Sequence, residues 1–162
     1  MVVLYQIRTK LSRTIFLRVI KKIFYPLSFK KEFSLDLDDD AGLLPNKKQI
    51  VVGTDSIVEG DHFQKNEKNP SLIAKKLLRV NLSDLAAMSS YPFGYTLNLS
   101  LPKKLTKNKL INWIKLFAKG LKQDQSKYKI KLLGGDTVIT NGPLVLSITL
   151  FGYKKKKNYK EI

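Results

Sequence analysis

The sequence predicts an α/β (α+β) domain with a mixed sheet of four or slightly more strands and helices on one face. Two observations support this fold class. Strand-like and helix-like apolar periods alternate in the order βαβαββ, and 162 residues suit one domain that buries about two-thirds of its unfolded surface. Cysteine is absent, which excludes disulfides, thiolate metal sites and a cysteine nucleophile. This composition is compatible with the cytoplasm, the expected location.

The N-terminal segment, residues 1–30, is predicted to be basic and helical. The first 31 residues contain eight basic residues and no acidic residue. Apolar side chains recur at helical spacing, at Ile15, Phe16, Val19, Ile20, Ile23 and Phe24. Arg18, Lys21 and Lys22 interrupt every apolar run, so this helix cannot span a membrane. A packed or loosely attached helix is favoured, with a membrane-surface or transit role and disorder as the alternatives.

The middle of the chain predicts strand, helix and strand. Residues 50–58 are rich in β-branched side chains, which favour a strand. Pro70 opens a helix, because proline is tolerated in the first turn. The apolar stripe of that helix is Leu72, Ile73, Leu77, Leu78 and Leu85. Residues 95–101 alternate apolar and polar side chains, which predicts a half-buried strand.

The last third predicts a second helix and further strands. Thr106 caps the helix. Its apolar positions are Leu110, Ile111, Trp113, Ile114, Phe117 and Leu121. Residues 130–133 form a third strand, and 137–140 and 144–152 are expected to pair as a hairpin across Asn141-Gly142.

Acidic residues are concentrated in four short segments of a chain whose net charge is +17. Six of the 13 acidic residues lie in 38–41, 54–56, 81–88 and 134–137, among glycines and small hydroxyl residues. Oxygen ligands of this kind suit Mg²⁺, which proteins usually share with substrate phosphates. The sequence therefore predicts a magnesium-dependent phosphate-handling site.

Each acidic segment taken alone has a plainer explanation. Asp84 has apolar neighbours, and burying an unpaired carboxylate is costly, so a cation or dense hydrogen bonding is expected there. The alternative is that Ser83-Asp84 caps a fresh helical turn. Residues 134–137 have the composition of a phosphate loop, but alone they favour an ordinary turn. His62, the only histidine, would more often be a surface residue.

The positive charge also has a plain explanation. Lysine supplies nearly all of it, and the abundance of lysine, asparagine and isoleucine indicates the residue usage of an AT-rich genome. Aromatic residues do not alternate with the lysines as a stacking platform for single strands requires. Neither a nucleic acid nor a membrane is expected as a partner, although a basic polyanion-binding module, with salt-sensitive binding, is the non-enzymatic alternative.

The four segments together, with Val58-Glu59-Gly60-Asp61-His62-Phe63, resemble thiamine-monophosphate kinase, a family of the aminoimidazole ribonucleotide synthetase-like superfamily. The resemblance covers about residues 20–152 and is most specific in 54–63 and 81–88. It implies the N-terminal fold of that superfamily and transfer of the ATP γ-phosphoryl group to thiamine monophosphate. Another ATP-dependent activity of the superfamily is the alternative.

The resemblance also implies roles for individual residues. No catalytic side chain is expected, because metal ions and positioning carry the reaction. Magnesium is assigned to Asp40, Thr54, Asp55, Asp84 and Asp136, ATP to Gly135 and Asp136, and the thiamine substrate to His62. A homodimer is expected, in which the N-terminal sheets pack together through the apolar face of residues 95–101.

Two departures from the family pattern stand out. Asp38 replaces a glycine, and aspartate tolerates positive φ less readily than glycine, so this position bears on the backbone geometry of the loop. The family's second domain is absent, which gives a layout of residues 1–30, an ATP- and Mg²⁺-binding domain over 31–153, and a lysine-rich tail over 154–162. A truncated or split enzyme is expected, with a separately encoded C-terminal half as a further partner.

Overall fold

The computed structural model describes residues 13–38, 43–44, 49–65, 67–103 and 107–154. Its centre is a four-stranded sheet in the order β1-β4-β2-β3. The strands are β1 (Ile50–Val58), β2 (Ser90–Pro102), β3 (Lys131–Thr140) and β4 (Val145–Lys154). Only β2 and β3 pair in parallel, and β4 is antiparallel to both β1 and β2. The predicted mixed sheet and the βαβαββ order are confirmed.

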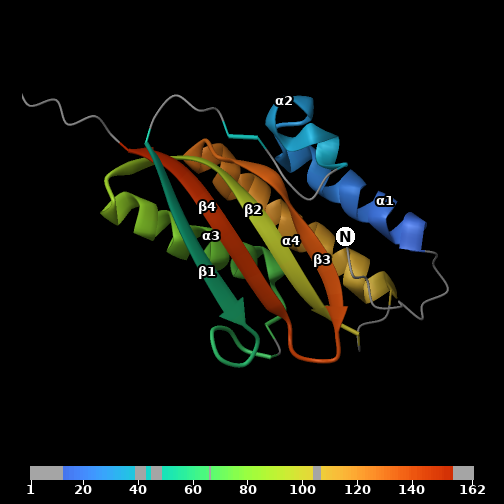
Figure 1. Ribbon diagram of the computed structural model, residues 1–162. Helices are drawn as coiled ribbons and strands as arrows, with labels where there is room; N and C mark the ends of the chain where they lie inside the picture. The colour runs from blue at the N-terminus through green and yellow to red at the C-terminus, as the bar shows by residue number, and fades with distance from the viewer. Residues whose placement is uncertain (1–12, 39–42, 45–48, 66, 104–106, 155–162) are drawn as a thin grey trace, which may run out of the picture.

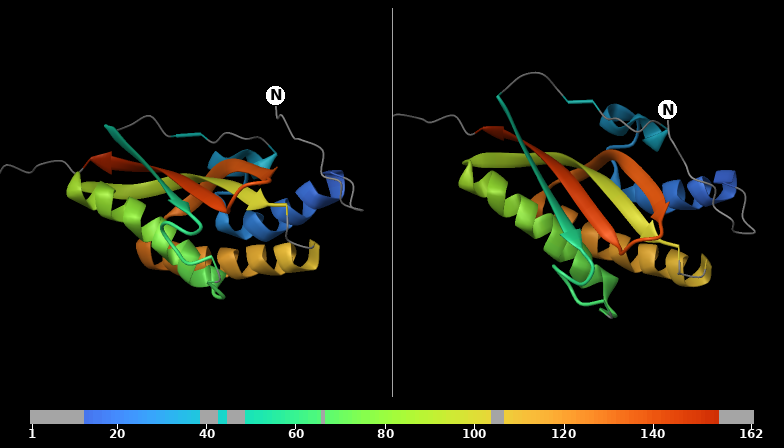
Figure 2. Two further views of the ribbon diagram at one scale, coloured as in Figure 1. Left: turned by 90° about the horizontal axis from the view of Figure 1, so that it is seen from below. Right: turned by 60° about the horizontal axis from the view of Figure 1, so that its bottom comes forward.

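Two long helices cover one face of the sheet, as Figures 1 and 2 show. They are α3 (Pro70–Ala87), beneath β1 and β4, and α4 (Lys107–Tyr128). In the predicted stripe of α3, Leu77 and Leu78 are fully buried, whereas Leu72 is 54% exposed and does not belong to it. A bidentate ion pair joins the helices, because Arg79 donates to both carboxylate oxygens of Asp124 at 2.7 and 2.9 Å.

Strand β2 shows how the two faces of the sheet differ. Leu97, Leu99 and Leu101 are buried against the helices, whereas Thr96 and Asn98 belong to the face that no long helix covers. The half-buried strand predicted for residues 95–101 is confirmed. Its apolar face, however, lies in the core of this chain, so the prediction that it forms a dimer contact is wrong.

The third strand and the predicted hairpin need correction. β3 is continuous from Lys131 to Thr140, so residues 134–137 are part of a strand and not a loop or turn after it. β4 does not pair with β3, because β2 lies between them. Asn141-Gly142 does form a turn, in which Gly142 N donates to Thr140 Oγ1 at 3.0 Å, but this turn crosses the end of β2. The central position gives β4 two neighbouring strands and buries its alternate leucines and isoleucine.

The N-terminal segments lie along the β3 edge of the sheet (Figure 1). They are α1 (Arg13–Phe24), η1 (Tyr25–Leu27), α2 (Lys31–Ser34) and η2 (Leu35–Leu37). α1 packs against α4 through the buried ring of Phe16, and Ser34 Oγ donates to Leu132 O at 2.8 Å. The packed helix is confirmed, while residues 1–12 lie outside the described part. No helix among the described residues is long and apolar enough to cross a membrane.

Candidate functional site

The first candidate segment lies on the edge strand β1. Thr54 belongs to the open face, where its Oγ1 donates to Ile148 O at 3.0 Å and lies 3.2 Å from Thr149 Oγ1. Asp55 is the next residue, so it belongs to the helix-covered side, where it remains exposed because β1 is an edge. Adjacent strand residues point to opposite faces, so Thr54 and Asp55 offer their oxygens to different sides of the sheet.

The second segment belongs to the last turns of α3. Asp84 is exposed, so the expectation that its apolar neighbours bury it is wrong. The helix places Leu85 toward the core and Asp84 on its flank, which is the effect of a 100° rotation per residue. α3 runs unbroken to Ala87, so a fresh turn capped by Ser83-Asp84 is also excluded. Ser83 Oγ instead donates to Val80 O at 2.7 Å.

The third segment lies on the opposite edge strand, β3. Asp136 faces the open side beside Asn98, whose Oδ1 accepts from Asp136 N at 3.2 Å. Gly135 has a φ of +150°, and a Cβ there would lie 1.9 Å from Leu97 O. The close approach of β2 and β3 is therefore a sufficient reason for glycine at this position.

His62 lies in the turn that follows β1. Its side chain is exposed, and its Nδ1 accepts from Val58 N at 3.3 Å. Its carbonyl oxygen accepts a hydrogen bond from the ammonium group of Lys76 on α3. The turn is closed by a hydrogen bond from Gly60 N to Phe63 O at 2.8 Å. The imidazole therefore stands at the end of the sheet where β1 stops and α3 begins.

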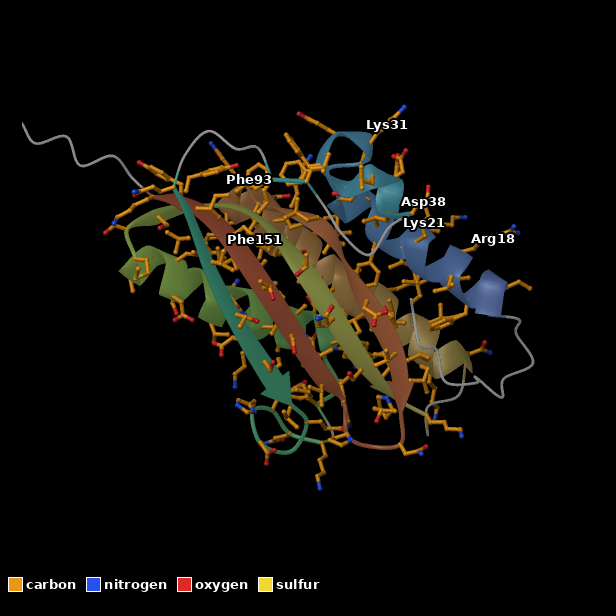
Figure 3. The ribbon with its side chains drawn as sticks, in the orientation of Figure 1. Arg18, Lys21, Lys31, Asp38, Phe93 and Phe151 are labelled. Atoms are coloured by element: carbon orange, nitrogen blue, oxygen red, sulfur yellow. The ribbon has the colours of Figure 1, made fainter. Side chains whose placement is uncertain are left out.

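The segment before residue 39 is held by α1. Lys21 Nζ lies 2.5 Å from Asp38 Oδ1, and Figure 3 shows the two side chains together. Tyr25 OH donates to Asp36 at 3.0 Å, and this hydrogen bond raises the pKa of Tyr25. The positive φ angles fall at Leu35, Asp36 and Leu37, whereas Asp38 has a φ of −91°. Aspartate therefore replaces the family glycine here without a positive φ at its own position.

The predicted site residues do not form one cluster. Asp40 lies outside the described residues. Asp55 and Asp136 lie on opposite edge strands and on opposite faces of the sheet. Within the described ranges, no group of three or more His, Asp or Glu side chains lies close enough to hold a metal ion. The described part of one chain therefore does not bring these aspartates together at one edge of the sheet.

One polar residue of the second segment had no predicted role. Asn81 is only 2% exposed, and its Nδ2 donates to Leu77 O at 2.9 Å. Its Oδ1 is a buried oxygen that has no hydrogen-bond partner among the residues the structure describes. The sequence signal is a polar residue within the apolar stripe of α3, a place where buried groups are normally paired.

The chemistry of these donors fits Mg²⁺. In the part of the chain that the structure describes, neither Asp55 nor Asp84 has an ion-pair partner. Asp55 lies on β1, and Asp84 lies on α3 together with Asn81 and its unpaired oxygen. These two elements pack together. Carboxylate and amide oxygens are ligands of hard divalent cations, and Mg²⁺ completes its shell with water and substrate phosphates. The residues present therefore suit a hard divalent cation that keeps part of its water shell.

Comparison with known proteins agrees with the fold. Residues 38–153 match the family model for AIR synthase related protein, N-terminal domain. The chain is 41% identical over 136 residues to thiamine-monophosphate kinase of Caulobacter vibrioides, covering 83% of this chain and 37% of that protein. The crystal structure of thiamine-monophosphate kinase from Stenotrophomonas maltophilia superimposes with a TM-score of 0.68 at 36% identity. That match covers 91% of this chain and 44% of the other.

A further solved structure, AaThiL complexed with AMPPCP and TMP, has a TM-score of 0.59 and 25% identity. The match covers 91% of this chain and 44% of the AaThiL chain. The chain thus spans less than half the length of each of these relatives. It belongs to the AIR synthase related protein family, whose N-terminal domain it contains, and within that family it resembles the thiamine-monophosphate kinases.

Proposed function

We propose that this chain supplies the Mg-ATP-binding part of a kinase that converts thiamine monophosphate to thiamine diphosphate. Residues 31–153 form the proposed nucleotide-binding domain. The observation that carries the proposal is the set of exposed carboxylates, Asp55, Asp84 and Asp136, on a fold similar to AaThiL, which has been solved with AMPPCP and TMP. The cytoplasm, which provides ATP, is the proposed compartment.

Phosphoryl transfer leaves a protein little covalent work, so binding and orientation are the tasks of these residues. Asp40, Thr54, Asp55, Asp84 and Asp136 are the proposed magnesium ligands. When bound, Mg²⁺ supplies charge neutralisation at the phosphate oxygens. Gly135 and Asp136 are the proposed contacts to ATP, and exposed His62 is the proposed contact to the thiamine substrate. None of these residues forms a covalent intermediate.

We propose that two copies of the chain complete one site. Asp55 and Asp136 lie three strands apart, about 14 Å at the usual strand spacing, and on opposite faces. A homodimer in which the open faces pack together, with β3 of one copy over β1 of the other, would place Asp136 of one copy beside the edge that carries Asp55 of the other. The open face is suited to such contact near β1, because it carries exposed Val52 and half-buried Phe151, whereas the ring of Phe93 packs against Phe29 and Phe33 of the same chain (Figure 3).

Calorimetry of ATP binding with and without Mg²⁺ tests the nucleotide proposal. Wild-type binding should require Mg²⁺, and Asp84→Asn should weaken it. A Lys109→Gln variant, which changes an exposed lysine of α4, serves as the control for altered surface charge. ATP affinity that is insensitive to EDTA and to Asp84→Asn would exclude the magnesium site.

Mixing two defective variants tests the shared site. Asp55→Asn and Asp136→Asn should each lose Mg-ATP binding as homodimers. A mixed dimer contains one site with both native aspartates, so an equimolar mixture should recover binding at up to one site per dimer. If sedimentation shows that the mixture is dimeric and Mg-ATP binding is still not recovered, the two aspartates belong to separate sites.

The kinase proposal is tested by thiamine diphosphate formation from ATP and thiamine monophosphate. This chain alone is expected to turn over slowly, because poor positioning of an acceptor can cost many orders of magnitude in rate. Addition of the separately expressed remaining region of a relative should raise the rate. Rapid turnover by residues 1–162 alone would show that the acceptor site is complete in this chain.

A further inference from the structure

Asn81 is the least explained buried group in the described core. It lies among the apolar side chains of α3, between Leu77 and Leu85, and is 2% exposed. Because its Nδ2 is hydrogen-bonded to Leu77 O, the amide cannot simply be rotated to give its oxygen a partner there. A buried acceptor without a donor costs free energy. A donor that arrives with a bound molecule would therefore pair an oxygen that the described residues leave without a partner.

The register of α3 against the sheet shows where Asn81 lies. A Cβ at Gly152 would lie 3.0 Å from Leu85, and Gly152 pairs with Val51. α3 runs in the same direction as β4, because it leads into Ser90 beside the end of that strand. Asn81 lies four residues before Leu85, which is about 6 Å along the helix axis and nearly the length of two strand residues. Asn81 is therefore level with Leu150 and its β1 partner, Gly53.

Gly53 provides open space at this level. It lies on the helix-covered side of β1, between Val51 and Asp55, and a Cβ built on it would have no atom within 4 Å. Asp84 lies on the flank of α3 one residue before Leu85. The packed pair of β1 and α3 thus carries the unpaired oxygen of Asn81, the open space at Gly53 and the exposed carboxylates of Asp55 and Asp84.

We infer that Asn81 positions the bound cation, and that its Oδ1 accepts a hydrogen bond from a water molecule of hydrated Mg²⁺. This inference rests on the proposed function. Mg²⁺ dehydrates reluctantly and keeps several waters. These waters donate hydrogen bonds, so they need acceptors, and an ammonium or guanidinium group offers none. An oxygen that lacks a donor is the complementary partner. Groups that orient metal-bound ligands in this way typically change metal affinity by about 10–100-fold when removed.

A substitution by leucine separates this role from a structural one. Asn81→Leu removes the unpaired oxygen and keeps the branching of the side chain at Cγ, so the melting temperature should stay the same or rise. The affinity for ATP in the presence of Mg²⁺ should fall about tenfold or more. Asn112→Leu, at an exposed asparagine of α4, is the matched control and should leave both quantities unchanged. Unchanged affinity for Asn81→Leu, whatever its melting temperature, would overturn the inference.

A measurement on the wild-type chain avoids any folding defect of the variant. Addition of Mg²⁺ and ATP should shift the side-chain amide resonances of Asn81, because its Oδ1 gains a hydrogen-bond donor, but not those of Asn112. A shift at the backbone amide of Asp84 with an unchanged Asn81 side-chain amide would overturn the inference and leave the proposed cation site intact. Absence of a shift at every residue would overturn both.

Discussion

The two faces of the sheet are built from the same strands but have different tasks. On β2 and β4 the helix-covered face carries buried apolar residues, namely Leu97, Leu99, Leu146, Ile148 and Leu150. The open face carries small hydroxyl and amide side chains that bond to one another, as Ser56 does to Ser147 at 2.6 Å. The helix-covered face therefore holds most of the buried apolar side chains of the sheet, whereas the open face outside the cluster of Phe29, Phe33 and Phe93 remains available for contact with another molecule. Substitutions at neighbouring residues of one strand, which lie on opposite faces, measure how much each face contributes to the free energy of unfolding.

The largest effect is expected for a core leucine. Leu99→Ala, at a residue that is 2% exposed, should lower the free energy of unfolding by about 2–5 kcal/mol. Ser100→Ala, at the next residue and on the other face, should change it by less than about 0.5 kcal/mol. Urea unfolding measures both values. Similar losses for the two variants would show that the open face is also part of the core.

A second comparison uses two glycines on opposite edge strands. Gly135→Ala should lower the free energy of unfolding by about 1–3 kcal/mol from strained backbone alone, and more from the 1.9 Å contact with Leu97 O. Gly53→Ala meets open space, so it should be neutral or raise stability by about 0.4–1 kcal/mol. Equal effects would remove the steric explanation for Gly135.

Tyr95 gives a pH-dependent test of the helix-covered side. It is fully buried, and Gln125 Nε2 donates to its hydroxyl at 3.0 Å and to Leu27 O at 2.8 Å. Burial raises the pKa of Tyr95 above its ordinary value of 10.0. Above about pH 10 the unfolded chain therefore loses this proton before the folded chain does, and stability falls as pH rises.

Tyr95→Phe should accordingly flatten the loss of stability above pH 10.0, the ordinary pKa of tyrosine. At neutral pH it should cost about 1 kcal/mol through the lost hydrogen bond. Urea unfolding across the alkaline range provides the measurement. A smaller slope should remain, because the pKa values of Tyr25 and Tyr153 are also raised. An unchanged slope would show that the Tyr95 phenol is not protected in the folded state.

The smallest effect is expected on the open face. Ser147→Ala removes the hydrogen bond to Ser56 from an accessible surface, so the free energy of unfolding should change by less than about 0.5 kcal/mol. If two copies pack through this face, the same substitution should change the dimer dissociation constant measured by sedimentation. A large loss of stability at a concentration where the chain is monomeric would contradict the contrast between the faces.

Local pattern was enough to predict most elements. Each of these elements had a local signal in the sequence. The signals were β-branched side chains at residues 50–58, a helix-starting proline at 70, and alternating apolar and polar side chains at 95–101. The family motifs likewise predicted the residues that we propose as Mg²⁺ ligands. These signals lie within a few neighbouring residues, so the sequence itself carries them.

Strand pairing and side-chain burial were decided by the tertiary structure. The insertion of β4 between β1 and β2 overrode the local hairpin signal at Asn141-Gly142, because a central strand buries more apolar surface than an edge strand. Asp84 is exposed because the flank of α3 beside the edge strand is uncovered, which its apolar neighbours could not reveal. The sequence determined which residues are candidate ligands, whereas long-range packing decided that Asp55 and Asp136 stand on opposite edges, since the order of strands depends on contacts between distant segments.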